Sequence, residues 1–172
     1  MSRIFVHGWG AVSPAGWGTP ALLEAWRRGE PVVPQPLARP GQPHPVAVRK
    51  VPPPTPRPAF LGHPRLRRTS PITHFAVGAA IEALGADAAK VAVGELRLGI
   101  VFCAFTGCVS YSRRFYDEVL REPATASPLI FPETVFNAPA SHLAAFLGSP
   151  AVNYTLVGDE GEFLKGVALA AE

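Results

Sequence analysis

The chain alternates between short apolar runs and segments in which apolar residues recur at helical spacing. Apolar runs of strand length predict buried strands at 4–6, 98–105 and 153–157. Helical segments are expected at 19–28, 71–84, 112–121, within 134–147, and at 162–172. The strands show no clean alternation of apolar and polar residues, so we expect both faces of the sheet to be covered. The pattern predicts an α/β domain with a mostly parallel sheet sandwiched by helices.

Two of these helices carry clear boundary signals. Thr19-Pro20 offers a hydroxyl N-cap and a proline at the first helical position, and Gly29 follows the last turn. Ser70-Pro71 opens the next helix and Gly85 ends it. One apolar face is expected on this second helix, made of Ile72, Phe75, Ala76, Ala79, Ala80, Ala83 and Leu84.

Residues 31–64 interrupt this pattern with twelve of the 20 prolines of the chain. Proline lacks an amide donor and disfavours helix in the residue before it. We therefore expect an extended, irregular insert with one short strand at 46–48, inside a single domain that covers residues 1–172.

Composition supports one folded domain. Hydrophobic residues make up 48% of the chain and charged residues 17%, which argues against wholesale disorder. No apolar run approaches the roughly 20 residues of a membrane span, and the first residues lack a signal-peptide pattern. We therefore expect a cytoplasmic protein without a membrane span.

The net charge of +3 is unevenly distributed, because residues 31–81 contain seven basic side chains and no Asp or Glu. Such a stretch suits nucleic acid, an acidic membrane or an acidic protein. Interleaved aromatic residues and known nucleic-acid motifs are absent, so we do not expect a nucleic-acid partner.

The two cysteines and five histidines do not indicate metal chemistry. Cys103 and Cys108 form neither a C-x-x-C motif nor a metal knuckle, and no histidines pair at ligand spacing. Cys103 lies in an apolar run, where a buried structural thiol is expected. We expect neither a metal nor a cofactor.

Four segments carry motifs in a fixed order: HGWGAVSPAG at 7–16, RLRRTS at 65–70, RLGIVF at 97–102, and PETVFNAPASH at 132–142, the last followed by LG and NYT. They resemble the patterns T-G-x-G-x-V-S-P-x-G, R-M-D-R-F-S, R-x-G-V-V-x-G and P-x-T-x-x-N of the β-ketoacyl synthase family. The resemblance covers most of residues 3–172, with the proline-rich insert matching poorly. It implies the N-terminal half of a thiolase-like fold, truncated before the second half.

The main departure from the family concerns its cysteine nucleophile. In β-ketoacyl synthases the third strand leads into T-A-C-A-S-G, where a helix N-terminus lowers the pKa of the thiol. The similar stretch here reads TLVGDEGE at 155–162, which puts Glu160 at the nucleophile position. The positive end of the helix dipole stabilises a carboxylate at a helix N-terminus, so the presence of Asp159 and Glu160 requires no catalytic role. The resemblance therefore implies a chain without a catalytic residue at this position.

A second departure concerns the two histidines that the family's second half supplies for decarboxylation. None of the histidines here matches them, and His142 is expected to serve packing or an interface. The chain resembles chain-length factors, which look like ketosynthases, lack the cysteine and pair with an active synthase.

Three functions follow from this resemblance. The first is a non-catalytic subunit, similar to a chain-length factor, in fatty-acid or polyketide-type acyl chain biosynthesis. The second is half of a split β-ketoacyl synthase, an acyltransferase active only with a separate C-terminal half. The third is a degenerate fragment that folds poorly.

The resemblance also implies two interaction surfaces. The strand Asn153, Tyr154, Thr155, Leu156 and Val157 would form the edge that meets a ketosynthase-like partner. Arg65, Arg67 and Arg68 would dock an acidic acyl carrier protein, with Arg67 replacing the family's Asp. A solvated turn before the helix at Ser70 is the alternative explanation for the arginines.

Overall fold

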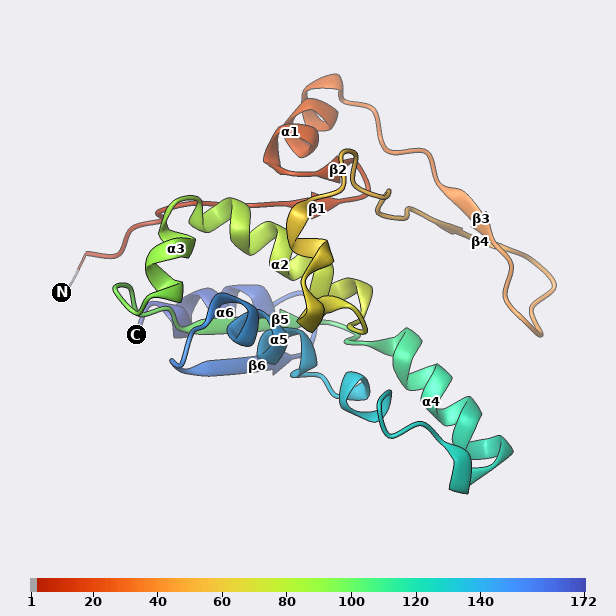
Figure 1. The fold of residues 1–172 in the computed structure, drawn as a ribbon. Coiled ribbons are helices and arrows are strands. Elements are labelled where there is room, and N and C mark those ends of the chain that lie inside the picture. Colours follow the sequence, from red (N-terminus) through yellow and green to blue (C-terminus); the bar gives the residue numbers. More distant parts are fainter. Residues whose placement is uncertain (1–2) are drawn as a thin grey trace.

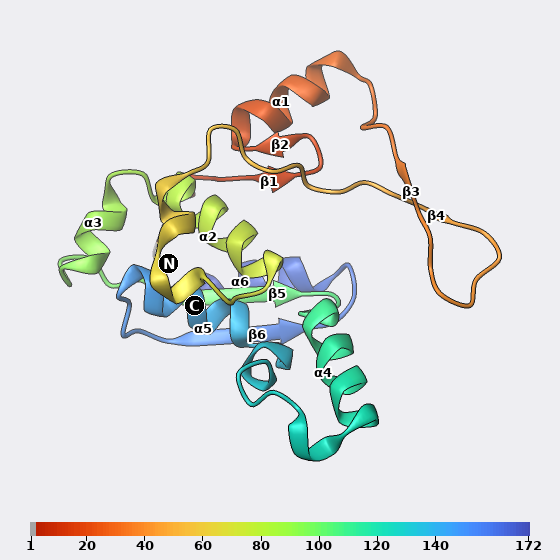
Figure 2. The ribbon, with the colours of Figure 1, turned by 45° about the vertical axis from the view of Figure 1, so that its right-hand side comes forward.

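The computed structural model describes residues 3–172, and a pair of parallel strands between helices lies at its centre (Figures 1 and 2). Strand β5 (Ile100–Ala104) pairs in parallel with β6 (Asn153–Val157) along the full length of both. Helix α6 (Glu162–Ala170) packs against this pair, as does α5 (Ala138–Leu147). The predicted α/β class is confirmed, but the central sheet has only these two strands within residues 3–172.

Alternation along β5 assigns its side chains to two helices. Ile100 belongs to the buried core together with Leu143 of α5. Val101 and Cys103 point to the opposite face and lie beneath α6. Gly166 permits this close approach, because a Cβ there would overlap the Sγ atom of Cys103. Both faces of the strand are therefore covered, as the continuous apolar pattern predicts.

Helix α2 (Pro71–Leu84) has the predicted bounds, but the prediction of a single apolar face is wrong. Val77 is fully buried in the core shared with α5. Ala79 and Ala83 lie on another side, where they contact the segment near the N-terminus. Because α2 is apolar almost all round, neighbours cover it on more than one side.

The strand predicted at 4–6 does not form. Ile4, Phe5 and Val6 are 64%, 77% and 87% exposed and have no partner strand within residues 3–172. The segment instead runs extended along α2 (Figure 1), where Gly8 and Gly10 bring its backbone against the helix. A strand needs a ladder of hydrogen bonds, and an apolar run alone does not supply the partner.

A small hairpin leads into the first helix. Strands β1 (Val12–Ser13) and β2 (Gly16–Trp17) pair antiparallel, and α1 (Thr19–Arg28) follows with the predicted bounds. The predicted hydroxyl cap is wrong, because Gly18 occupies the N-cap position and forms no side-chain cap. Glu82 of α2 accepts hydrogen bonds from the backbone N–H groups of Ala11 (2.9 Å) and Thr19 (2.6 Å). A carboxylate from another helix thus caps α1.

The proline-rich segment forms an arm that projects from the rest of the chain (Figures 1 and 2). The predicted strand at 46–48 is confirmed as β4 (Val46–Val48), and it pairs antiparallel with β3 (Gln35–Leu37), which the sequence did not predict. Two short 3₁₀ turns follow the arm, η1 (Ala59–Gly62) and η2 (Pro64–Leu66).

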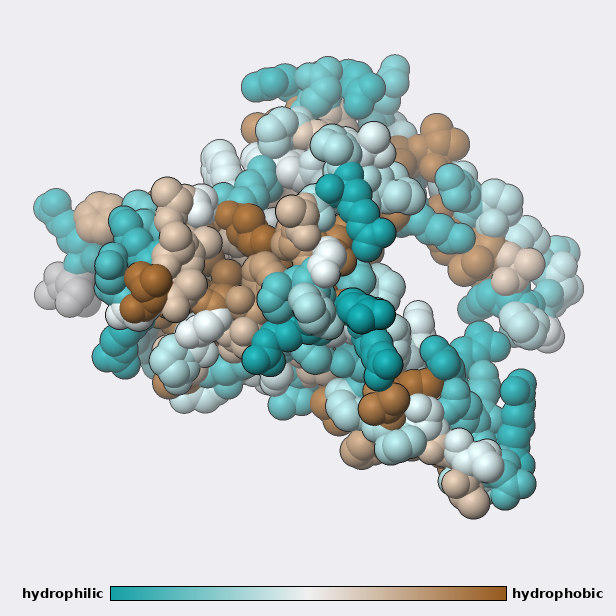
Figure 3. Space-filling view, in the orientation of Figure 1, coloured by the Kyte–Doolittle hydropathy of each residue, from teal (hydrophilic) through white to brown (hydrophobic). Residues whose placement is uncertain are grey.

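The remaining elements connect the core to its periphery. Helix α3 (Asp87–Ala92) was not predicted, and α4 (Val109–Arg121) begins earlier than expected. The 3₁₀ turns η3 (Pro123–Thr125) and η4 (Phe131–Thr134) link α4 to α5. Figure 3 shows hydrophilic residues over the outside of α1 and hydrophobic residues reaching the surface beside α4.

Candidate functional site

The turn between β6 and α6 holds the residue predicted at the nucleophile position. Gly158 continues the ladder by donating its N–H to the carbonyl of Ala104 (3.3 Å), and Asp159 Oδ1 accepts from the N–H of Gly161 (2.9 Å). Glu160 lies between them at the exposed tip, and its side chain forms no hydrogen bond or ion pair within residues 3–172. The hydrogen bonds of Gly158 and Asp159 therefore fix the conformation of the turn, and Glu160 is exposed to solvent.

Neither thiol of the chain lies in this turn. Cys103 is on β5, half-buried rather than buried as predicted, and its Sγ lies 3.4 Å from the carbonyl oxygen of Glu162 at the start of α6. Cys108 is buried at the N-terminal end of α4, with its Sγ 3.2 Å from Ser70 Oγ. Burial raises the pKa of the Cys108 thiol; the Ser70 hydroxyl acts to lower it and the charge of Glu133 adds to the rise. Cys108 is thus a neutral thiol near pH 7, a poor nucleophile.

Strand β6 has the predicted bounds, with a free edge on the side away from β5 within the described residues. Tyr154 is 50% and Val157 46% exposed along it. Helix α6, which follows, exposes Phe163 (67%) and Leu164 (71%). An unpaired strand beside uncovered apolar side chains is a surface that another chain can cover.

The three arginines predicted as a docking surface do lie together. Arg65, Arg67 and Arg68 are exposed on η2 and the turn after it, and they line one hollow. None of the three forms an ion pair in the part of the chain that the structure describes. The rim of the hollow therefore carries three positive charges that form no ion pair within residues 3–172.

A buried carboxylate, which the sequence did not reveal, lies beneath these arginines. Glu133 of η4 is 5% exposed, and its Oε1 atom lies 2.6 Å from Nε2 of His142 on α5. Its other oxygen accepts the N–H of Ser70 at the start of α2 (3.3 Å). The carboxylate joins three elements at the floor of the hollow. Nothing in the spacing of these residues along the chain points to this contact.

The sequence predicts neither a membrane span nor a metal site, and residues 3–172 can be compared with both predictions. No helix among them is long and apolar enough to cross a bilayer. They also contain no group of three or more His, Cys, Asp or Glu side chains placed to hold a metal ion.

The fold is that of ketosynthase and chain length factor chains. The solved structure of the ishigamide ketosynthase/chain length factor superposes with a TM-score of 0.75 at 21% identity, covering 96% of this chain and 47% of that one. The ketosynthase ApeO in complex with its chain length factor ApeC, from Xenorhabdus doucetiae, gives a TM-score of 0.59 at 16% identity. This match covers 99% of the chain and 61% of the solved one.

The chain thus spans less than two thirds of the length of either solved chain. No family model matches it, and no curated protein does. At these identities the likeness establishes the fold, and it agrees with the thiolase-like resemblance of the four sequence motifs.

Proposed function

We propose that this chain is a non-catalytic, ketosynthase-like subunit, similar to a chain length factor, that acts in fatty-acid or polyketide-type acyl chain assembly. One observation carries the proposal: within a ketosynthase/chain length factor fold, the β6–α6 turn presents Glu160 and holds no thiol. A condensing enzyme of this family transfers the acyl chain to a cysteine at this turn. An acyl group on the Glu160 carboxylate would instead be an anhydride, which water hydrolyses readily.

The proposed partner is a ketosynthase-like subunit that covers β6. The free edge of β6 can pair with a strand of another chain, while Tyr154 and Val157 supply apolar contacts along it. Both solved neighbours are described as combining a ketosynthase with a chain length factor, which supports a pair of this kind.

The proposed second partner is an acyl carrier protein, docked on Arg65, Arg67 and Arg68. Carrier proteins are acidic, and the three side chains are exposed, unpaired within residues 3–172 and gathered around one hollow. Exposed charges contribute little individually, so binding is expected to depend on the set. Carrier-protein affinity measured across a salt series for the wild type and the triple Arg→Glu variant tests this. An affinity unaffected by both salt and substitution would leave the arginines a role in solubility alone.

Condensation assays test the assignment as a non-catalytic subunit. The isolated chain, supplied with acyl and malonyl carrier protein, should give no β-ketoacyl product. Glu160→Cys should not restore it, because none of the five histidines in residues 1–172 matches the decarboxylating histidines of the family. Co-expression with a ketosynthase from the same gene neighbourhood should yield a stable pair. A β-ketoacyl product from the isolated wild-type chain would refute the proposal.

The alternative is half of a split synthase, and the same reagents distinguish it. A separately encoded C-terminal half would then restore condensation when mixed with this chain, and the product would be lost when Glu160 is changed to Gln. A non-catalytic subunit would instead give product only through the cysteine of its partner, with Glu160→Gln having no effect.

A further inference from the structure

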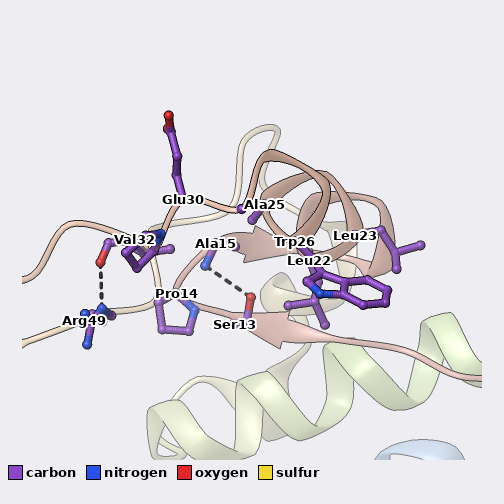
Figure 4. A pocket seen from close by; sticks show the side chains of 12 residues that line it. Ser13, Pro14, Ala15, Leu22, Leu23, Ala25, Trp26, Glu30, Val32 and Arg49 are labelled. Atoms are coloured by element: carbon purple, nitrogen blue, oxygen red, sulfur yellow. Dashed lines mark hydrogen bonds between the residues drawn. The ribbon is translucent and has the colours of Figure 1, made fainter.

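An apolar hollow of about 720 Å³ lies between α1, the β1–β2 turn and the base of the proline-rich arm (Figure 4). Its size falls in the range of roughly 300–1,000 Å³ that small-molecule sites occupy. Its apolar lining includes Pro14, Ala15, Leu22, Ala25, Trp26 and Val32. Leu22 is 42% and Trp26 78% exposed, so the chain itself leaves this surface largely uncovered.

One cation lies at the edge of this hollow and is held in a defined orientation. Arg49 Nε donates to the carbonyl oxygen of Val32 (2.7 Å), which ties the two sides of the arm together at its base (Figure 4). Within residues 3–172 its terminal NH₂ groups form no hydrogen bond or ion pair. Among the residues that the structure describes, Glu30 is the only acidic one that lines the hollow, and its side chain points away from Arg49 (Figure 4).

We propose that this hollow binds an amphiphile with an aliphatic tail and a carboxylate head. The apolar walls would cover the tail, since removing apolar surface from water favours binding on both sides of the contact. The free NH₂ groups of Arg49 match the planar, bidentate geometry of a carboxylate. The charge selects this class of ligand over an uncharged apolar molecule. This site is separate from the β6 edge and the arginine hollow, so it does not depend on the proposed function.

Titration calorimetry on the full chain tests the site with linear carboxylates of increasing length, kept below their micelle concentrations, and with the alcohols of the same lengths. We expect saturable binding of one carboxylate per chain that tightens with length. Each carboxylate should bind about tenfold more tightly than its alcohol, because a hydrogen bond to a charged group is at stake. Arg49→Gln should remove this preference, and it should weaken the binding of each carboxylate far more than the binding of the alcohol of the same length.

Two further variants distinguish binding in this hollow from nonspecific hydrophobic binding. Ala25→Leu keeps a good helix former in α1 while filling the hollow, so it should weaken long carboxylates by about tenfold or more. Arg57→Gln is the matched control, since Arg57 lies in the same proline-rich segment and bonds to the carbonyl of Leu61 outside the hollow. Equal affinity for acid and alcohol would overturn the proposal. So would binding that does not saturate, or an Arg49→Gln variant that binds like Arg57→Gln.

Discussion

Replacing Glu82 with glutamine removes one charge and tests how the N-terminal hairpin and α1 are held to the rest of the chain. The carboxylate accepts N–H groups from Ala11 and Thr19 with separate oxygens. Glutamine retains one carbonyl oxygen and turns the other position into an NH₂ group, which would face an N–H donor. One of the two hydrogen bonds is therefore lost, and the other loses its charge.

The expected cost is about 2 kcal/mol. Hydrogen bonds to charged groups contribute roughly 1.5–3 kcal/mol each, and the lower part of that range applies because Glu82 is only half-buried. For a chain of this size, such a loss lowers the melting temperature by about 4–8 °C. Urea denaturation followed by circular dichroism measures the loss in the free energy of unfolding at constant temperature.

The pH dependence supplies a second check on Glu82. Burial acts to raise the pKa of this carboxyl, but the hydrogen bonds from Ala11 and Thr19 outweigh it and leave the pKa below its ordinary value of 4.5. The stabilisation is therefore complete above pH 4.5 and is lost as the pH falls through the lowered pKa of the folded state. The difference in stability between wild type and Glu82→Gln should shrink over this acidic range.

The control is Glu95→Gln, because Glu95 is exposed and its side chain forms no hydrogen bond within residues 3–172. It should change the free energy of unfolding by less than about 0.5 kcal/mol. If Glu82→Gln proves no more destabilising than Glu95→Gln at pH 7, the capping role of Glu82 is refuted.

Three further predictions concern packing and association. Gly10→Ala should destabilise by about 1–3 kcal/mol in chemical denaturation, because its Cβ would overlap the backbone of Ala79, while Gly62→Ala, with open space around it, should stay near wild type. Glu133→Gln should lower the free energy of unfolding by about 2 kcal/mol, because His142 and the N–H of Ser70 lose their buried carboxylate partner. Thermal denaturation followed by circular dichroism measures this, and an unchanged melting temperature would contradict it. The isolated chain should self-associate in sedimentation experiments, and Tyr154→Lys on the free edge of β6 should reduce this; a clean wild-type monomer with a sharp melt would speak against it.

The sequence predicted the elements whose information is local. The bounds of α1, α2 and β6 were correct because proline, glycine and apolar spacing mark them directly. The run at 4–6 has the composition of a strand, but pairing depends on a distant partner that no local pattern reveals. The cap of α1 was misassigned for the same reason, since Glu82 reaches it from another helix.

In the candidate site, too, the sequence predicted the features that depend on neighbouring residues and missed those that depend on distant ones. Glu160 lies between the strand and the helix that the sequence predicts, and adjacency in sequence keeps Arg65, Arg67 and Arg68 together. The role of Glu160 at the nucleophile position stays a prediction. The contact between Glu133 and His142 depends on how η4 and α5 meet in three dimensions, and nothing in the sequence alone could reveal it.

The pairing of β5 with β6 has a consequence for the order in which the chain folds. Ile100 meets Asn153 only after α4, α5 and the turns between them have been traversed, so a long loop must close before the first rung of the ladder forms. Non-local parallel pairing of this kind is slow compared with helix formation. During synthesis β5 leaves the ribosome well before β6, so this apolar strand stays unpaired until β6 has been made. That interval is when a growing chain is most open to a chaperone or to misassembly with another copy.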